Sequence, residues 1–206
     1  MIKNMIKVII FDLGSVIFKE DWISLNEEFI KKFGISTLIR SNYGLEIQKV
    51  YDDALVGKKS MADVFNKICE VKGLNFDIDK LCSFYKEAYK RNKKLNLEIV
   101  EIIKNIRKNF KVICLTDTNH IHFEAHQEQG ILDLFDEKFG SHQIGIRKKD
   151  PKVFEIILKK LNVDPKEVLF IDDNLKNIEN AKSLGIKVIH FKDNVQLIKE
   201  LDKILH

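Results

Sequence analysis

The chain alternates between short apolar runs and longer segments of helical period, and this alternation constrains the fold more than any other feature. Strand-like runs rich in β-branched and aromatic residues occupy 7–11, Lys111–Thr116, Val168–Asp172 and 187–191, with a weaker run at 137–141. Between these runs, apolar residues recur on one helical face, as at Ile99, Ile102, Ile103 and Ile106. Strands and helices that alternate at this spacing form a parallel sheet with right-handed crossovers. We therefore predict an α/β fold with a Rossmann-like, parallel five-stranded sheet.

The segment 19–93 departs from this pattern, because it contains amphipathic helical stripes and no convincing buried strand. The stripes are Trp22, Leu25, Phe29 and Phe33; Met61, Val64, Phe65 and Ile68; and Ile78, Leu81, Cys82, Tyr85 and Tyr89. We predict that 1–18 and 94–206 form the α/β domain and that 19–93 is an inserted all-helical cap. An insertion after the first strand would overhang the carboxyl ends of the strands. We interpret its aromatic residues as cap core rather than substrate contacts.

Composition narrows the class of protein. The chain of 206 residues is 45% hydrophobic and 32% charged, so it can bury a sizeable core. Its net charge of +4 comes from 35 Lys and Arg spread among 31 Asp and Glu, without the dense basic block of a nucleic-acid-binding protein. Cys69, Cys82 and Cys114 lie in apolar patterns and read as reduced core thiols. Because charged residues interrupt every hydrophobic run, we expect no signal peptide or membrane span and a cytoplasmic protein.

Polar residues follow several of the apolar runs. Asp12 ends the first run, Thr116 ends the second, and Asp172 and Asp173 follow the third, while Lys148 precedes a helix. A parallel sheet brings its strand ends to one edge, so these carboxylates, the hydroxyl and the ammonium should lie together. Such a set can bind a divalent cation and a phosphoryl group, and a carboxylate can attack phosphorus. The sequence therefore predicts phosphoryl chemistry at this edge.

At these residues the chain resembles the haloacid dehalogenase-like hydrolase superfamily over essentially its full length. The four matching motifs, in order, are F-D-L-G-S-V at 11–16, L-T-D-T-N at 115–119, G-I-R-K at 145–148 and F-I-D-D-N-L-K-N-I at 170–178. The helical insertion between the first two motifs is similar to the cap that covers small-molecule sites in this family. The combination of D-L-G, T-N and D-D-N-x-x-N-I resembles phosphatases of the glucose-1-phosphatase type.

The resemblance implies catalytic and substrate-binding roles. Asp12 would be the nucleophile that forms an aspartyl-phosphate. Thr116 would donate a hydrogen bond to the phosphoryl oxygens, and Asp117 lies beside it among the substrate-binding positions. Lys148 would neutralise the phosphoryl charge and hold Asp12 ionised, because a nearby cation favours the carboxylate.

The resemblance also implies a metal site. Asp12, the backbone carbonyl of Gly14, and Asp173 would ligate the ion, and Asp172 would contact it through water. Mg²⁺ is the expected cofactor, because an open oxygen site that also uses substrate phosphate suits this ion.

Several positions depart from the family pattern. Most family phosphatases place an aspartate two residues after the nucleophile as general acid, but this chain has Gly14 there, as the resembling sugar-1-phosphatases do. Loss of a general acid typically lowers the rate by roughly 10²–10⁴-fold. Asp117 stands where asparagine is usual, and Lys149 where proline is common. The pair Asp52-Asp53 either replaces the missing acid or forms a solvated helix face.

The histidines at 120, 122 and 126 cluster after the second motif. On a helix, His122 and His126 would share a face at a spacing compatible with zinc, but no third ligand is evident. Surface or cap-facing positions are the alternative, and we favour these.

The predicted function is a magnesium-dependent phosphatase that acts on a small phosphorylated metabolite such as a sugar phosphate. Its expected partner is that small-molecule ester, not nucleic acid or a membrane. One alternative is a catalytically weak protein that binds a phosphorylated metabolite and acts as a regulator. The other is a metal-free 2-haloacid dehalogenase, although the family's dehalogenases lack the paired acids Asp172 and Asp173.

Overall fold

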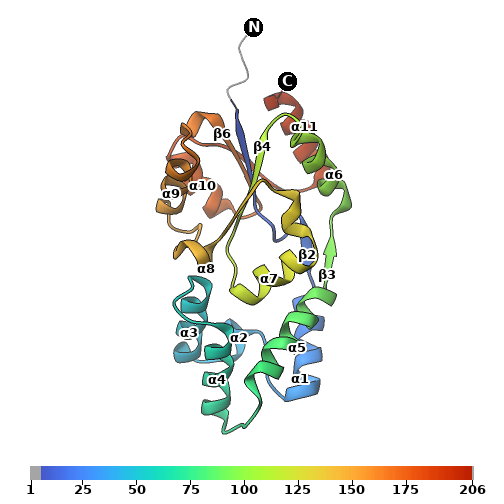
Figure 1. The fold of residues 1–206 in the computed structure, drawn as a ribbon, viewed down its shortest axis with the longest axis vertical. Coiled ribbons are helices and arrows are strands. Elements are labelled where there is room, and N and C mark those ends of the chain that lie inside the picture. The colour runs from blue at the N-terminus through green and yellow to red at the C-terminus, as the bar shows by residue number, and fades with distance from the viewer. Residues whose placement is uncertain (1–5, 206) are drawn as a thin grey trace.

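The computed structural model describes residues 6–205, and at its centre lies a sheet of five parallel strands (Figure 1). Its order is β5-β4-β1-β6-β7. The strands are β1 (Val8–Phe11), β4 (Lys111–Thr116), β5 (Glu137–Gly140), β6 (Val168–Asp172) and β7 (Lys187–His190). The first strand is central, because Val8 pairs with Lys111 on one side and with Val168 on the other. The predicted parallel five-stranded sheet is confirmed.

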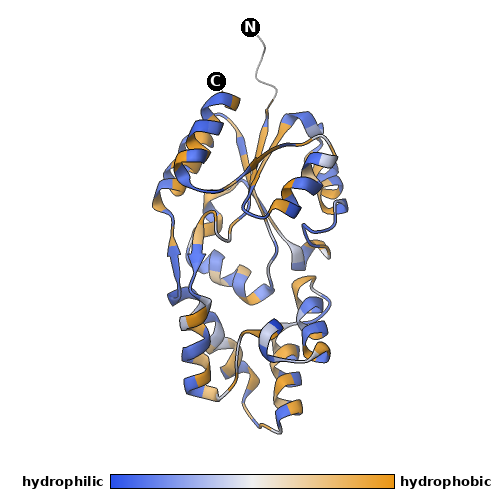
Figure 2. Ribbon diagram, turned by 180° about the vertical axis from the view of Figure 1, so that it is seen from behind, coloured by the Kyte–Doolittle hydropathy of each residue, from blue (hydrophilic) through white to orange (hydrophobic). Residues whose placement is uncertain are grey.

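Helices cover both faces of this sheet, as the alternating side chains of β1 require. Ile9 and Phe11 pack in one hydrophobic cluster with α6 (Leu97–Ile106), α11 (Asn194–Leu205) and η1 (Ile131–Leu134). Val8 and Ile10 pack in another with α9 (Lys152–Leu161) and α10 (Leu175–Ser183). The apolar stripes of these helices face the sheet (Figure 2). The remaining short elements of this part are α8 (Ser141–Ile144) and η2 (Pro165–Glu167).

The helical insertion lies beyond the carboxyl ends of the strands (Figure 1). It contains α1 (Trp22–Phe33), α2 (Ile39–Asn42), α3 (Leu45–Leu55), α4 (Met61–Lys72) and α5 (Ile78–Arg91). These helices enclose a hydrophobic cluster of their own, in which the Phe29 and Phe65 rings stack 5.3 Å apart. Capping groups fix several of the helix starts; Ser60 and Asp63 form a capping box at α4, and Asp77 caps α5. The all-helical cap is therefore present, while its boundaries at 19 and 93 stay a prediction.

A two-stranded ribbon, which was not predicted from the sequence, connects the insertion to the sheet. Strands β2 (Phe18–Glu20) and β3 (Lys93–Leu95) pair antiparallel, with Glu20 opposite Lys93. Strand β2 follows β1 and strand β3 precedes α6. The chain therefore enters and leaves the cap through two adjacent strands. Both strands are three residues long, too short for a hydrophobic period to mark them.

A second set of contacts joins the cap to the α/β part, away from the ribbon. The Ser141 hydroxyl donates a hydrogen bond of 2.6 Å to the Leu55 carbonyl at the end of α3. Gly57 comes so close to this region that a Cβ there would lie 2.0 Å from the carbonyl oxygen of His142, and its φ of +74° also favours glycine. These contacts attach the cap to the α/β part at a second place besides the ribbon.

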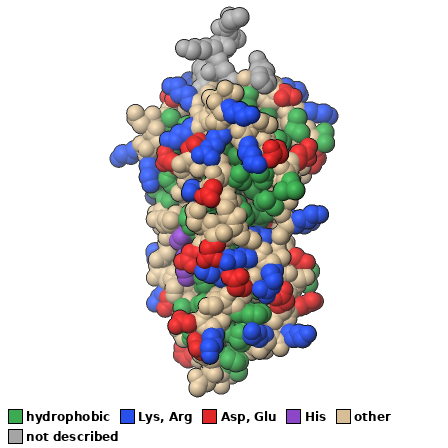
Figure 3. Space-filling view, turned by 45° about the vertical axis from the view of Figure 1, so that its right-hand side comes forward, with side chains coloured by type: hydrophobic (Ala, Val, Ile, Leu, Met, Phe, Trp, Pro, Cys, Tyr) green, Lys and Arg blue, Asp and Glu red, His purple; other side chains and the backbone are tan. Residues whose placement is uncertain are grey.

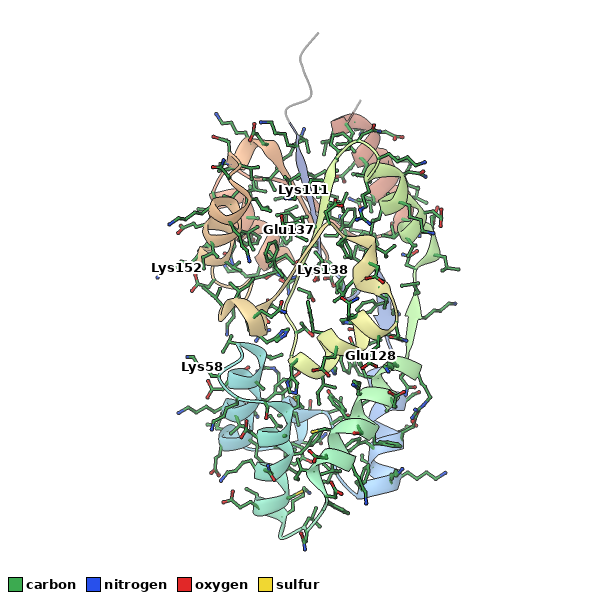
Figure 4. The ribbon with its side chains drawn as sticks, viewed as in Figure 1. Lys58, Lys111, Glu128, Glu137, Lys138 and Lys152 are labelled. Carbon is green, nitrogen blue, oxygen red and sulfur yellow. The ribbon has the colours of Figure 1, made fainter. Side chains whose placement is uncertain are left out.

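Helix α7 (His120–Glu128) lies between the two parts and belongs to both (Figure 1). Its Ile121 and Ala125 pack in the hydrophobic cluster of the cap. At its end, Glu128 binds Lys86 at 2.7 Å and also pairs with Lys90, both on α5 (Figure 4). The cap therefore rests on a helix that follows β4 directly.

The surface carries charges of both signs, and the cysteines form no disulfide among the described residues. Acidic and basic side chains are interspersed over the face drawn in Figure 3. Within residues 6–205, no helix combines the length and the apolar character needed to span a membrane. The three cysteines are free thiols; Cys69 and Cys114 are buried and Cys82 is partly buried.

Candidate active site

The site is organised around Asp12, which follows β1 at the carboxyl edge of the sheet. Its backbone N–H donates a hydrogen bond of 2.9 Å to the carbonyl of Ile171 in β6, which fixes the residue between two strands. Its side chain is buried, and the carboxylate oxygen Oδ1 lies 2.6 Å from the Nζ of Lys148. The sheet topology thus places the predicted nucleophile beside the predicted lysine.

Lys148 is buried with its ammonium between two carboxylates. Besides Asp12, its Nζ donates a hydrogen bond of 2.7 Å to Oδ2 of Asp172, which is completely buried at the end of β6. Asp172 also accepts hydrogen bonds from the Asn174 N–H at 2.7 Å and from the Asn177 side chain at 3.1 and 3.2 Å. Such saturation compensates for much of the cost of burying the charges.

The loop that carries Lys148 is fixed by polar contacts on both sides. Asp117, after β4, accepts hydrogen bonds from the Lys148 N–H at 2.9 Å and from Nε of Arg147 at 3.1 Å. The Asn180 side chain on α10 donates to the carbonyls of Lys148 and Lys149. Both oxygens of Asp117 therefore serve the loop, so this acid positions the lysine.

Burial governs the ionisation of the central pair. It raises the pKa of Asp12 to about 8, against the opposing effect of Lys148 and with a further increase from Asp172. Burial lowers the pKa of Lys148, but the neighbouring carboxylates raise it more, so the residue stays an ammonium. Lys148 acts to lower the pKa of Asp12, in the direction expected from the sequence, and its role in holding Asp12 ionised stays a prediction.

The donor set beside Asp12 suits a divalent cation. Asp12, Asp172 and Asp173 each offer a carboxylate oxygen within 4.8 Å of the others. Oxygen ligands of this kind suit Mg²⁺, and a cation here would supply the positive charge that ionised Asp12 still requires. Asp173 is the exposed member, whereas the oxygens of Asp172 already have protein donors. This difference fits direct ligation by Asp173 and contact through water by Asp172.

Gly14 adopts a backbone conformation that is open to other residues. Its φ lies outside the left-handed region, and the positive φ of this turn, 59°, belongs to Ser15. A Cβ at position 14 would meet the Glu20 carboxylate oxygens at 3.5 and 3.9 Å, which is ordinary van der Waals contact. Glycine is therefore not required here by backbone strain, and the space above it is occupied by Glu20.

A cavity of about 250 Å³ lies between the sheet edge and the cap. The α/β part contributes Asp12, Gly14, Thr116, Lys148 and Asp173, all predicted site residues. The cap and ribbon contribute Glu20, Trp22, Tyr51, Leu55 and Tyr89. Trp22 and Tyr89 belong to stripes interpreted as cap core; the structure places both against the cavity. Asp52 instead pairs with Arg40 and Arg147, and neither it nor Asp53 lines the cavity.

His122 and His126 face the cap and are not arranged as a zinc site. His122 contacts the Tyr85 hydroxyl at 3.0 Å and the Asn119 side chain at 3.4 Å. His126 contacts the Tyr89 hydroxyl at 3.3 Å and Nζ of Lys93 at 2.9 Å. Each ring nitrogen thus has a protein partner.

Acid should weaken the fold through these two histidines. Burial, assisted by Lys93, lowers the pKa of His122 to about 3 and of His126 to about 2. The unfolded chain binds their protons below its ordinary histidine pKa, so stability falls as pH falls below about 6.5. We expect each histidine to cost about 2 kcal/mol of unfolding free energy at pH 5 relative to pH 7.5. Urea unfolding of the wild type and His126→Gln tests this; an equal loss in both proteins would contradict it.

Comparisons with known proteins agree with this geometry. The family model described as haloacid dehalogenase-like hydrolase matches residues 6–185. The chain is 25% identical to D-ribitol-5-phosphate phosphatase of Bacteroides thetaiotaomicron over 98% of its own length and all of that protein. It is 26% identical to drimenol cyclase drtB of Aspergillus calidoustus over 93% of its own length, but spans only 35% of that relative.

Solved structures share the fold. A HAD family enzyme from Bacteroides thetaiotaomicron, in complex with magnesium and inorganic phosphate, superposes with a TM-score of 0.77 at 23% identity. The match covers 91% of this chain and 94% of that one.

Proposed function

The chain belongs to the haloacid dehalogenase-like hydrolases, and from this premise we propose that it is a magnesium-dependent phosphatase of small phosphate esters. The observation that carries the proposal is the buried ammonium of Lys148, which lies 2.6 Å from Asp12 and 2.7 Å from Asp172 on the cavity floor. A nucleophilic carboxylate, a fixed cation and a group of acids in one small cavity are the components that phosphoryl transfer requires.

The residues divide the chemistry between them. Asp12 attacks phosphorus and the bond to the leaving oxygen breaks, which forms an aspartyl-phosphate. Thr116 donates a hydrogen bond to a phosphoryl oxygen, and Lys148 neutralises the charge that develops on the others. Water then attacks the same phosphorus, which releases inorganic phosphate and restores Asp12. Mg²⁺, held by Asp12, Asp173 and the Gly14 carbonyl, supplies further charge neutralisation when bound.

The small volume of the cavity favours a substrate with few carbon atoms. Its volume of about 250 Å³ lies below the usual range for ligand pockets, and the cap residues Tyr51, Leu55 and Tyr89 limit its depth. Aromatic side chains beside polar groups suit the mixed faces of a sugar or polyol. D-ribitol-5-phosphate, the substrate in the name of one relative, has this character. We propose a sugar or polyol phosphate of similar size, acted on in the cytoplasm without a nucleic-acid partner.

A substrate panel tests the proposal. We expect Mg²⁺-dependent phosphate release from polyol, pentose, hexose and triose phosphates, with lower kcat/KM for nucleotides. Binding of these esters without turnover would instead identify a regulatory protein that binds phosphorylated metabolites. Halide release from a 2-haloacid in excess chelator would identify a dehalogenase.

Substitution of Asp173 should weaken metal binding selectively. Asp173→Asn removes one anionic ligand but keeps the size of the side chain, so we expect the Mg²⁺ concentration for half-maximal activity to rise by about tenfold or more. Calorimetric titration with magnesium chloride should show the same change. Asp202→Asn, an exposed substitution on α11, is the matched control. Equal magnesium dependence in both variants would remove Asp173 from the metal site.

A further inference from the structure

The proposed phosphatase reaction leaves one requirement without a residue. An alkoxide leaving group needs a proton, and Gly14, two residues after the nucleophile, has no side chain to give one. The cavity should therefore hold another acid close to the same position.

Glu20 on the connecting ribbon occupies that position. Its carboxylate oxygens are the nearest atoms to a Cβ placed on Gly14, at 3.5 and 3.9 Å. An aspartate at 14 would extend its own carboxyl group into this space, and Glu20 reaches it from β2 instead. Glu20 also lines the same cavity as Asp12 and Lys148. We propose that Glu20 is the general acid and base of this hydrolase, in the place that the glycine leaves open.

The other carboxylates of the cavity are engaged elsewhere. Among the described residues that line it, Asp12 binds Lys148, Asp173 lies in the group of metal-binding acids, and both oxygens of Asp117 accept hydrogen bonds from the 147–148 loop. Glu20 is the carboxylate of this wall that remains for proton transfer.

A series of polar side chains adjoins the Glu20 carboxyl group. Glu20 interacts electrostatically with the Tyr89 hydroxyl, which lies 3.3 Å from Nε2 of His126, and Nδ1 of His126 lies 2.9 Å from Nζ of Lys93. The Lys93 ammonium can only donate, so Nδ1 accepts and Nε2–H donates to Tyr89. The Tyr89 O–H is then available to donate to Glu20.

The two steps balance through Glu20. As the Asp12 oxygen bonds to phosphorus and the ester P–O bond breaks, the Glu20 proton passes to the leaving oxygen and an alcohol departs. Water then attacks phosphorus, gives its proton to the Glu20 carboxylate, and the bond to Asp12 breaks. Inorganic phosphate leaves, and both carboxyl groups return to their starting states.

Glu20→Gln tests the assignment, because glutamine keeps the size and the acceptor oxygen but cannot transfer the proton. Single-turnover rates should be measured with magnesium across esters that range from nitrophenyl to primary alkyl phosphates. We expect alkyl esters to lose roughly 10²–10⁴-fold and nitrophenyl phosphate to change little in this step. Hydrolysis of the aspartyl-phosphate should also slow, so nitrophenol should appear in a burst. Glu27→Gln is the control, because it removes the same charge from an exposed position on α1. Its single-turnover rates should match those of the wild type.

A second variant separates proton transfer from a structural role. Gly14→Asp combined with Glu20→Ala returns a carboxyl group to the same space from the other side, and the backbone at Gly14 tolerates a Cβ. This protein should regain part of the alkyl-ester rate relative to Glu20→Ala alone.

The outcomes distinguish this inference from the proposed function on which it rests. A wild type that hydrolyses no phosphate ester would overturn both. An active wild type with a Glu20→Gln variant that is unchanged, or slowed equally for all leaving groups, would overturn the role of Glu20 alone.

Discussion

Asp12→Asn should abolish turnover, lowering kcat/KM by roughly 10⁴–10⁶-fold, while the protein stays folded. The amide has nearly the size of the carboxylate but cannot form the acyl phosphate. Its oxygen can still accept a hydrogen bond from Lys148, and Asp172 remains as the counterion at 2.7 Å. The measurement is kcat/KM on the best ester of the panel, together with the urea midpoint of unfolding.

The same variant also tests the intermediate. Acid-quenched wild type should retain base-labile phosphate after reaction with labelled ester, whereas Asp12→Asn should retain none. Turnover of the variant within tenfold of the wild type would show that another group attacks phosphorus.

Lys148→Met should have the largest effect on stability. It removes the ammonium between Asp12 and Asp172 and leaves two buried carboxylates facing each other, which typically costs about 3–5 kcal/mol. Without the cation, the pKa of Asp12 should rise further above that of the unfolded chain. The folded variant then binds more protons than the unfolded chain, so its deficit relative to wild type should shrink as pH falls from 7.5 toward 5.

Lys149→Met is a matched control, because the adjacent lysine is exposed. We expect this change to alter the unfolding free energy by no more than about 0.5 kcal/mol. A deficit in Lys148→Met that does not change with pH would indicate lost packing rather than uncompensated charge.

The sheet was predictable because of where its strands lie. The three inner strands β1, β4 and β6 are buried and form nearly continuous apolar runs, whereas the edge strands β5 and β7 are only partly buried. Each of the five predicted runs overlaps a strand of the structure. The ribbon β2–β3 was not predictable, because each strand has three residues and its partner lies more than 70 residues away along the chain. No local period marks a pair that is specified by the closure of a long insertion.

The candidate site was likewise predictable only in part. Asp12 follows β1, while Thr116 and Asp172 end β4 and β6, so parallel topology alone brings them to one edge. Glu20 was missed because its position depends on the ribbon, and the role of Asp117 was missed because it depends on the Arg147 and Lys148 contacts. The backbone conformation of Gly14 could not be predicted from the sequence either, because the positive φ of the D-L-G-S turn lies at Ser15. Side-chain partners across segments need tertiary structure.

The central position of β1 has a consequence for how the chain reaches its native state. The strand is synthesised before both of its neighbours, which begin about 100 and about 160 residues later. Such non-local pairing forms slowly, because the long intervening chain must close before the strands can pair. During translation the apolar strand must wait unpaired, with both edges open to misassociation, until β4 and then β6 leave the ribosome. A nascent chain that stops before Asp172 carries Asp12 and Lys148 but lacks one of the two carboxylates that hold the lysine.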